Sequence, residues 1–528
     1  MYKTKKEGRR DETSQYLLKR RERSMGEKAN WRSLMDQAYS LALPNLNPYR
    51  LQTPGSNMAW NVYDCTLELG LTKFVNRMIN ALVPSDISWV KLVSGHLIPE
   101  EEREETDLAL QEITDTFFFY LRQSNFDLVI HEAFTDMAIS LGVIQVNEGP
   151  DDDPLLFSCI PSAYVGIETG PRGEINAFFR DWFCVHEYHC IELWGEDFVV
   201  PESIRKHDGE DLYMDLYELT YYDYKDRIYK YFIIEKSTSE ICYRKESVSW
   251  EWIGFRWSKL AGEDYGRGPV LSALPSAATI NKAMQDELAL AALKCAPPLM
   301  AVTENIINPY TFKIAPNEII RVMPGTNGEW PLQPFPVGGD IQFASLIVGD
   351  LRSQINEIMM AMPLNLPPKG PVRTATEVAM TQNELRENAG AQFSRVQKEL
   401  FDPLVKRVLW ILQKKGFVQP LSIDGKAVSL NYTTPLMLSK NQVDLEKMIH
   451  WFEVMSGMFT PGVAMNALDA AKMPRWIGEK LNADLSLIKD EGDIIALMQQ
   501  GQELAEQAIE QQQSGQPQPQ EPLSTGLQ

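Results

Sequence analysis

Cysteine is scarce in this sequence. Six cysteines in 528 residues are too few and too widely spaced for a disulfide framework, so we expect reduced thiols. Long apolar runs are missing too, because no stretch reaches the roughly 18 uncharged apolar residues that crossing a membrane requires. The charged N-terminal stretch, residues 1–28, is not followed by an apolar one and is not expected to be a secretory signal. These absences predict a soluble, intracellular protein with no membrane partner.

Common catalytic signatures are also absent. The sequence contains no phosphate-binding G-x-x-x-x-G-K-[ST], no nucleophile elbow G-x-S-x-G and no zinc helix H-E-x-x-H. These absences argue against ATP hydrolysis and hydrolase chemistry. We therefore expect no enzyme activity, no catalytic residue and no cofactor.

Positive charge is in short supply as well. The formal net charge is −21, which argues against a protein that coats nucleic acid, since phosphate binding needs a cationic surface. An acidic surface is still compatible with DNA that moves past without sticking, provided that basic contacts are local.

One short segment holds residue types that bind metals. It is CVHEYHC, with Cys184, His186, His189 and Cys190. A strand would place Cys184 and His186 on one face, whereas a helix would group His186, His189 and Cys190. Structural zinc normally takes four ligands from two separated pairs, and no second pair is evident. We interpret the segment as packing and predict no metal, with a metal-binding enzyme as the alternative.

Two charged clusters have simpler interpretations. Asp151–Asp153 stand beside a glycine and prolines, which is typical of a solvated turn rather than a divalent-metal site. The basic cluster Lys19, Arg20, Arg21 and Arg23 is mixed with glutamates. It is interpreted as a solvated helix face, with contact to a neighbouring subunit as the alternative.

The periodicity of apolar residues predicts an α+β fold that is mostly helical. Helical spacing covers residues 58–83, 99–124 and 126–141. Residues 142–257 are rich in Val, Ile, Tyr, Phe and Trp between turn signals, which predicts hairpin strands, with a short helix near 185–195.

The second half of the sequence predicts helices around two irregular segments. An alanine-rich helix ends at Pro297, and Pro275 inside its span means either that the helix begins there or that it is kinked. A small insert with a strand or two follows, and then a second helix. A long helix is expected from the capping box at Thr374 to about Gly416, with Gly390 as a candidate bend.

The loop between the second helix and the long helix is stiff and basic. Its sequence, MPLNLPPKGPVRTATEV, contains Pro367, Pro368, Lys369 and Arg373. Proline lowers the entropy lost when a loop is held in place, and two cations per subunit suit sequence-independent phosphate contacts. The spacing alone also allows an ordinary loop without a ligand.

This order of elements resembles that of phage portal proteins. The resemblance is closest to the head-to-tail connector family of short-tailed, podovirus-type phages. It extends over roughly residues 40–500. The stretches that carry it are LQTPGSNMAWNVYDCTLELGLTKFVNRMINALVP (51–84), GEDYGRGPVLSALPSAATINKAMQDELALAALKCAPPLM (262–300), RTATEVAMTQNELRENAG (373–390) and TTPLMLSKNQVDLEKMIHWFEVM (433–455).

The resemblance implies a portal fold with wing, stem, clip and crown. The implied parts are a wing at 1–268, helical then β-rich; stem helix 1 at 269–296; the clip at 297–338; stem helix 2 at 339–362; a tunnel loop at 363–373; the long helix and wing return at 374–436; the crown at 437–510; and a disordered tail at 511–528.

The same resemblance implies what the protein does. Roughly twelve copies would form a ring at one capsid vertex of the virion, after assembly in the host cytoplasm. The implied partners are double-stranded DNA in the channel, the terminase packaging motor, a tail adaptor protein, and the major capsid and scaffolding proteins. A soluble oligomeric scaffold without DNA contact is the alternative.

Individual residues acquire roles through the resemblance. The implied DNA contacts in the tunnel loop are Pro367, Pro368, Lys369 and Arg373, with Lys282 and Lys294 as secondary candidates in the stem. Tyr310 and Arg321 are the implied partner contacts of the clip.

Overall fold

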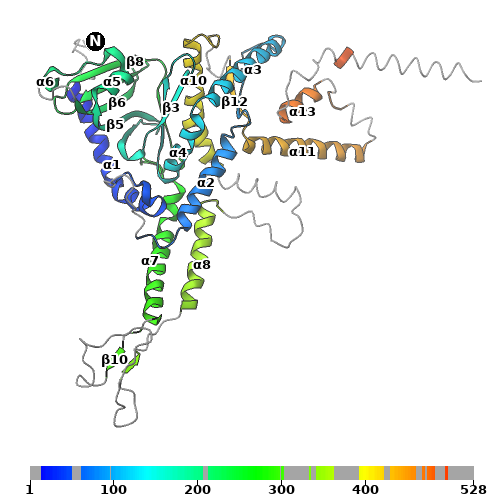
Figure 1. Cartoon of the computed structure of the whole chain (residues 1–528). Coiled ribbons are helices and arrows are strands. Elements are labelled where there is room, and N and C mark those ends of the chain that lie inside the picture. Colours follow the sequence, from blue (N-terminus) through cyan, green and yellow to red (C-terminus); the bar gives the residue numbers. More distant parts are fainter. Residues whose placement is uncertain are drawn as a thin grey trace, which may run out of the picture. The chain divides into compact units, whose positions relative to one another are not determined.

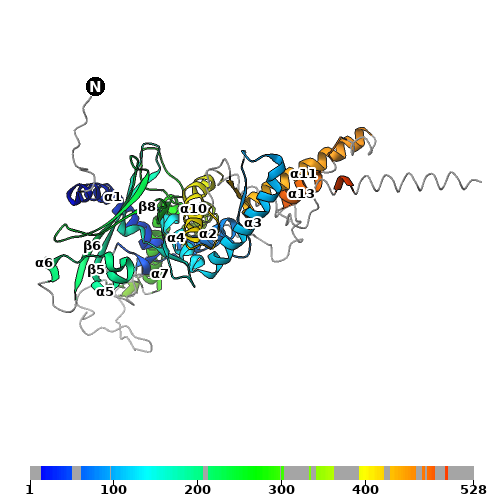
Figure 2. The same ribbon diagram turned by 90° about the horizontal axis from the view of Figure 1, so that it is seen from above.

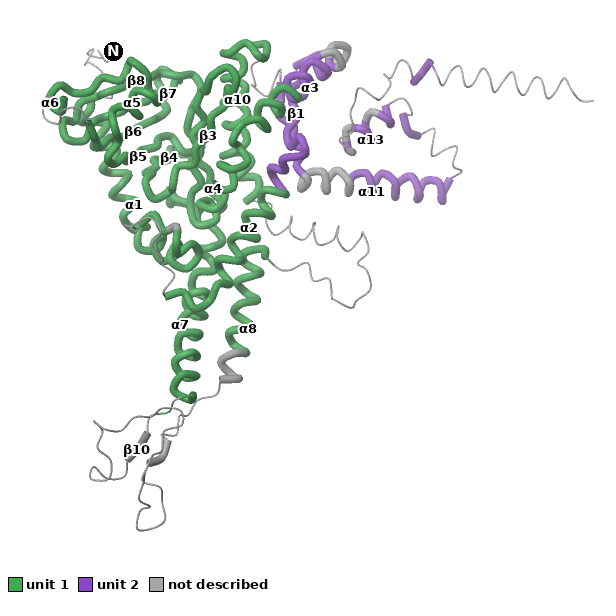
Figure 3. The backbone as a smooth tube through the Cα atoms, viewed as in Figure 1, with its two compact units in different colours: residues 1–80, 115–374, 387–421 green, residues 81–114, 375–386, 422–528 purple. Residues whose placement is uncertain are grey.

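The computed structural model of the chain describes its central part in detail. The described residues are 13–49, 61–95, 97–205, 212–295, 341–361, 392–420 and 428–459, with shorter stretches at 297, 299–301, 332–334, 390, 467–469, 472–481 and 494–496. Two compact units divide the chain, the first formed by residues 1–80, 115–374 and 387–421 and the second by 81–114, 375–386 and 422–528 (Figure 3).

The described fold is α+β and mostly helical, as predicted (Figure 1). Helices assigned to unit 1 are α1 (Ser14–Ala42), α2 (Thr66–Leu82), α4 (Phe126–Ile139), α5 (Glu187–Trp194), α6 (Glu202–Arg205), α7 (Pro269–Cys295), α8 (Ile341–Ile358) and α10 (Asp402–Lys414). Unit 2 contains α11 (Pro435–Met458) and α13 (Met473–Leu481). α3 (Glu100–Gln123) has residues in both units, and α2 ends in unit 2 with Ala81 and Leu82.

The hairpin strands predicted for residues 142–257 are confirmed as two antiparallel sheets in unit 1. The larger sheet has the order β4 (Val165–Thr169), β5 (Ile175–His186), β6 (Tyr213–Asp223), β7 (Ile228–Glu235) and β8 (Ile241–Ser247). The smaller has the order β3 (Leu155–Cys159), β2 (Gly142–Glu148) and β9 (Trp252–Phe255). Two strand pairs complete the described set: β1 (Val90–Ser94) with β12 (Val428–Tyr432), and β10 (Leu299–Ala301) with β11 (Leu332–Pro334).

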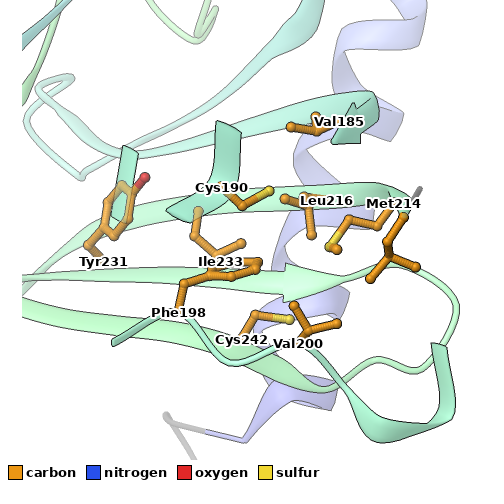
Figure 4. Packing of buried hydrophobic residues seen from close by; sticks show 10 residues of the cluster. Val185, Cys190, Phe198, Val200, Met214, Leu216, Tyr231, Ile233 and Cys242 are labelled. Carbon is orange, nitrogen blue, oxygen red and sulfur yellow. The ribbon is translucent and has the colours of Figure 1, made fainter. Parts of the chain in front are cut away.

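Both faces of the five-stranded sheet are buried. Because side chains alternate along a strand, Leu216 of β6 packs with Cys190 of α5 on one face (Figure 4). Leu219, three residues on, packs with Leu17 of α1 on the other face. Helices α1 and α5 therefore lie on opposite sides of β5 and β6 (Figure 2).

Polar contacts hold α1 on its face of the sheet. Arg20 donates to Glu168 at 2.9 Å, and Arg21 donates from Nε to Asp181 at 2.8 Å. Lys28 is buried, and its Nζ donates to the carbonyl oxygens of Ser162, Ala163 and Val165. Three acceptors match the three hydrogens of an ammonium group. A helix that is polar on most sides is thus docked by hydrogen bonds as well as by Leu17 and Met35.

One predicted helix start is wrong, and an alternative that the sequence left open is decided. Helix α2 begins at Thr66 rather than near residue 58, because the Asp64 carboxylate accepts the Thr66 amide at 2.9 Å and ends the preceding non-helical stretch. Helix α7 begins at Pro269, the residue at which the resemblance placed the start of this helix, and not at Pro275. Pro275 lies inside the helix on an exposed position.

The helix that ends at Lys414 contains a local irregularity. Residues Gln397–Phe401 form a π-helical turn immediately before α10. The Glu399 carboxylate in this turn accepts from the backbone amide, Nε and Nη2 of Arg256, a fully buried side chain. The predicted beginning of this helix, from Thr374 to residue 389, lies outside the described residues.

Candidate functional site

The paired helices α7 and α8 form the most extended feature of unit 1. They pack against each other side by side, away from the two sheets (Figure 1). The first part of α7 is embedded in unit 1, with Val270, Ala273 and Ile280 among its buried residues. Beyond Ile280 no described residue of α7 is fully buried, and Leu288 and Leu293 are about half exposed. Most of the alanine-rich surface of this helix is therefore open for contact with something else.

A short segment before α2 joins the two helices. The backbone amide of Tyr63 donates to Asn281 Oδ1 of α7 at 2.6 Å, and Asn281 Nδ2 donates to the Asn61 carbonyl oxygen at 2.8 Å. From α8, Arg352 donates through Nε and Nη2 to Asp64 Oδ2, at 2.9 and 2.6 Å. Residues 61–64 thus contact both helices of the pair.

The Asp64 carboxylate is held in its ionised form. Its side chain is only 7% exposed, and this burial opposes ionisation. The hydrogen bonds from Thr66 and Arg352 outweigh burial and hold the pKa of Asp64 below its ordinary value. The ion pair is therefore a fixed structural link and not a titrating site near neutral pH.

The inner end of α8 is fixed against α2. Gly70 of α2 faces Met359, and a Cβ added at Gly70 would lie 3.2 Å from Met359 Cγ. Arg77 of α2 donates from Nη1 to the carbonyl oxygen of Met360, whose φ is 50°. The backbone leaving α8 toward the predicted basic loop is thereby held at a defined place.

The two predicted stem cations are on α7. Lys282 is 67% exposed and pairs with Asp286, one helical turn on, at 2.9 Å. Lys294 is exposed in the last turn of the helix. Charged residues of both signs occur along this surface: Lys282, Asp286, Glu287, Lys294, Asp350, Arg352 and Glu357. The pair of helices therefore presents mixed charge and no cationic stripe.

The other predicted contact residues lie outside the described part of the chain. These are Pro367, Pro368, Lys369 and Arg373 of the predicted tunnel loop, and Tyr310 and Arg321 of the predicted clip.

The CVHEYHC segment does not gather metal ligands. Cys190 points into the core of the sheet (Figure 4). His189, on the same helix, is 65% exposed. His186 Nδ1 accepts the Tyr188 amide at 3.1 Å and caps α5. Among the described residues, no group of three or more His, Cys, Asp or Glu side chains could hold a metal ion. The segment crosses from strand to helix at His186, which separates its possible ligands.

The acidic turn is joined to the end of α10 by an ion pair, and a cavity lies nearby in unit 1. Asp151 accepts Lys415 Nζ at 2.8 Å on the surface, as a solvated turn would. A cavity of about 540 Å³ lies between the two sheets, and buried Glu218 is at its wall. Glu218 accepts from Trp182 Nε1 and Tyr231 Oη, both at 2.6 Å. Burial and this carboxylate raise the pKa of Tyr231 well above its ordinary value, so the phenol keeps the proton that it donates.

The described structure contains no helix long and apolar enough to span a bilayer.

The sequence did not predict Asp64, Asn281 or Arg352 as residues that join α7 and α8 to the segment before α2. The one local signal was the Asp64–Thr66 spacing of a helix cap, because the Arg352 partner is 288 positions away.

These features define a structural class: an α+β body carrying a firmly anchored pair of helices with an open, small-residue surface. Residues 14–488 match the family described as bacteriophage head to tail connecting protein. The chain therefore belongs to the head-to-tail connector family of bacteriophages.

The chain is similar to a phage protein and, more distantly, to chains of gene transfer agent particles. It is 21% identical over 454 residues to a probable portal protein of Bordetella phage BPP-1, covering 81% of this chain and 79% of the relative. A chain in the virion of a native gene transfer agent particle has a TM-score of 0.36 at 12% identity, covering 79% of this chain and 93% of that one. A chain in the neck of an empty gene transfer agent particle has a TM-score of 0.34 at 13% identity, covering 72% of this chain and 88% of that one.

Proposed function

We propose that this protein is the portal of a podovirus-type phage, a non-enzymatic ring of roughly twelve copies at one capsid vertex. DNA enters through the ring during packaging, is retained behind it, and leaves through it at infection. The observation that carries the proposal is membership of the head-to-tail connector family over residues 14–488.

The described helices support a role in a ring. Half-exposed Leu288 and Leu293 on the alanine-rich α7 leave apolar surface for a neighbouring copy to cover. The link from α7 and α8 to residues 61–64 would keep the pair in place while DNA moves past. Residues 269–296 and 339–362 are proposed as the stem.

Charge supports a channel that does not trap DNA. The chain carries a net charge of −21, and the described stem surface shows mixed charge, so phosphate contacts would be few and local. We assign them to Lys369 and Arg373 of the proposed tunnel loop, residues 363–373, beside Pro367 and Pro368. Lys282 and Lys294 are secondary candidates.

The remaining parts are assigned to assembly. Residues 1–268 and 374–436 are proposed as the wing, and residues 437–510 as the crown. The proposed clip, residues 297–338 with Tyr310 and Arg321, would meet the terminase motor during packaging and the tail adaptor afterwards. The major capsid and scaffolding proteins would contact the ring in the host cytoplasm and then in the virion.

The mass of the purified assembly tests the proposal. Native mass spectrometry or averaged electron micrographs should show a closed ring of about a dozen 60.1 kDa chains around a central hole. A monomer or dimer at micromolar concentration would contradict the ring and favour a soluble scaffold.

A further inference from the structure

Helix α8 ends in a strained turn at Met360. The amide of Ala361 donates to the carbonyl oxygen of Asn356 at 2.7 Å, and the amide of Met360 donates to that of Glu357 at 2.9 Å. These two bonds form a Schellman motif, whose left-handed residue is usually glycine. Here that residue is methionine, with φ at 50°, a conformation that is uncommon for residues other than glycine. The backbone at the end of α8 therefore needs other contacts to stay in this conformation.

Helix α2 supplies contacts of that kind. Gly70, Phe74 and Arg77 lie at positions i, i+4 and i+7 of α2 and therefore share one face of the helix. We call these three residues the α2 stripe. A Cβ added at Gly70 would lie 3.2 Å from Cγ of the fully buried Met359, and the Arg77 guanidinium donates to the carbonyl oxygen of Met360. Strained backbone persists where its surroundings fix it, and the α2 stripe is part of those surroundings.

The α2 stripe also contacts the chain where its description resumes. The Phe74 ring lies 5.2 Å from that of Trp257, which lies 5.7 Å from that of Phe393, both in edge-to-face geometry. All three rings are buried, and Phe393 belongs to the helical segment that runs into α10. Edge-to-face aromatic pairs are favourable beyond the area that they bury. The chain before residue 362 and the chain after residue 391 are thus both connected to the one helix α2.

The proposed DNA contact lies between these two places in the sequence. Lys369 is eight positions after Ala361, and Arg373 is twelve positions after it. A chain advances by at most about 3.6 Å per residue, so the place where it leaves α8 limits where these two cations can reach. Ala361 is fully buried, which fixes the start of that span.

We infer that the α2 stripe positions the proposed DNA-contacting cations, Lys369 and Arg373, by fixing the end of α8. This inference deepens the proposed function and rests on it, because it assumes that these cations contact DNA phosphates. The stripe residues are positioning residues, which act on the cations through Met360 and the backbone that follows it. A contact held about 1 Å out of place loses much of its effect, so losing a positioning residue should resemble losing the cations.

Arg77→Met in phage particles tests the inference. The change removes the donor to the Met360 carbonyl oxygen and keeps an unbranched side chain in place. Rings should form as in the unmodified phage, but filled heads should lose DNA at least about threefold more often, as expected for Lys369→Ala with Arg373→Ala. Arg77→Lys restores a donor and should recover most of the retention. Quantitative PCR of nuclease-protected DNA gives the amount retained per particle.

Two combined variants separate positioning from a general loss of stability. Arg77→Met added to Lys369→Ala and Arg373→Ala should lose no more DNA than the two loop changes alone, because changes that act through one contact are not additive. Arg77→Met with Met360→Gly should regain DNA, since glycine adopts the left-handed turn without help from Arg77. A change that only destabilised the subunit would show neither pattern.

Lys73→Met is the matched control. Lys73 is exposed on α2, so the substitution removes the same charge from the same helix, and DNA retention should not change. Thermal unfolding and native mass spectrometry check that each variant folds and forms rings. If Arg77→Met does not assemble, Gly70→Ala replaces it. The added Cβ presses on Met359 while alanine favours the helix, so DNA loss should rise in a folded subunit.

Each result decides a different point. If Arg77→Met, or Gly70→Ala in its place, retains DNA like Lys73→Met, the α2 stripe does not position the cations. If Arg77→Met adds to the loss caused by the two loop changes, Arg77 acts elsewhere and the inference is also wrong. If Lys369→Ala with Arg373→Ala loses no DNA, the proposed loop contact itself fails, whatever the Arg77 variants do.

Discussion

Asp64, Lys28 and Arg256 are ionisable residues that join separate segments of unit 1. The Arg256 guanidinium is fully buried, and besides Glu399 it donates to the carbonyl oxygens of Asp264 at 2.7 Å and Gly173 at 2.9 Å. Burying a charged group is unfavourable unless its hydrogen bonds are satisfied. These residues therefore specify which segments pack together more than they add net stability.

The link between α8 and residues 61–64 should be sensitive to one substitution. Arg352→Ala leaves the nearly buried Asp64 carboxylate without its cation, and we expect a loss of about 1–2 kcal/mol in the free energy of unfolding. Lys282→Ala removes a cation from an exposed pair and should change it by less than about 0.5 kcal/mol. Urea unfolding of both variants measures the difference. If Arg352→Ala lowers the free energy of unfolding by no more than Lys282→Ala does, the Asp64 contact adds no stability.

Lys28 should give stability a distinct pH dependence. Burial lowers its pKa from 10.5 to about 7, against the attraction of Asp181 and Asp136. Between about pH 7 and 10.5 the unfolded chain therefore binds a proton that the folded chain releases, so stability rises with pH in this window. Asp136 has its effect at lower pH. Burial raises its pKa to about 6, so its contribution to the free energy of unfolding falls as pH rises from about 4 to 6.

Replacing Lys28 should remove the upper part of this profile. We expect Lys28→Met to lose most of the rise in apparent Tm between pH 7 and 10, whereas Lys19→Met, at an exposed position, should keep it. Thermal unfolding over this pH range is the measurement. An unchanged slope in Lys28→Met would mean that the amine keeps its ordinary pKa.

Among the elements, the π-helical turn at Gln397–Phe401 determines which side chains before and after it face the core. It places Glu399 against Arg256, while Phe393, before the turn, packs on Trp257 at a ring distance of 5.7 Å. Leu400 and Leu404 are also buried, so apolar residues on both sides of the turn face the core. π-helical turns contain an extra residue and often mark functional positions.

Deleting one residue from this turn should disrupt the packing on one side of it. Removing Lys398, which is exposed, would rotate one part of the helix relative to the other by about 100°. Either the Phe393 contact or the Glu399 contact would then be lost, at an expected cost of about 3 kcal/mol or more. Lys398→Ala keeps the chain length and should be nearly neutral. Comparable unfolding curves for the two variants would refute this role.

For the whole molecule, the proposed function requires an acidic chain to restrain an acidic polymer, DNA, through a small number of basic side chains. The net charge is −21, so a ring would repel DNA except where basic side chains are placed at a constriction. Of the proposed contacts, Lys282 is already paired with Asp286. The proposed tunnel loop therefore carries the main expected grip.

Neutralising the loop tests that grip. In phage particles that carry Lys369→Ala with Arg373→Ala, we expect rings to form normally but filled heads to lose DNA severalfold more often, because two phosphate contacts per subunit are gone. Lys282→Ala is the matched control and should have little effect. The measurement is the DNA content per particle, by quantitative PCR after nuclease treatment. Unaltered retention would remove the loop from the DNA-gripping role.

The sequence by itself determined the class of fold and the positions of most elements. Local signals were sufficient for helices such as α4 and α7, for the hairpins between residues 142 and 257, and for the family resemblance. These signals depend on spacing, turns and caps within a few residues, which the sequence displays directly.

Only the tertiary structure decided which distant residues meet. Asp64 and Arg352 are 288 positions apart, and Arg256 and Glu399 are 143 apart. In the CVHEYHC segment, the change from strand to helix at His186 turned Cys190 into the core and His189 outward. Such pairings depend on how several elements pack together, and no periodicity within one element encodes that arrangement.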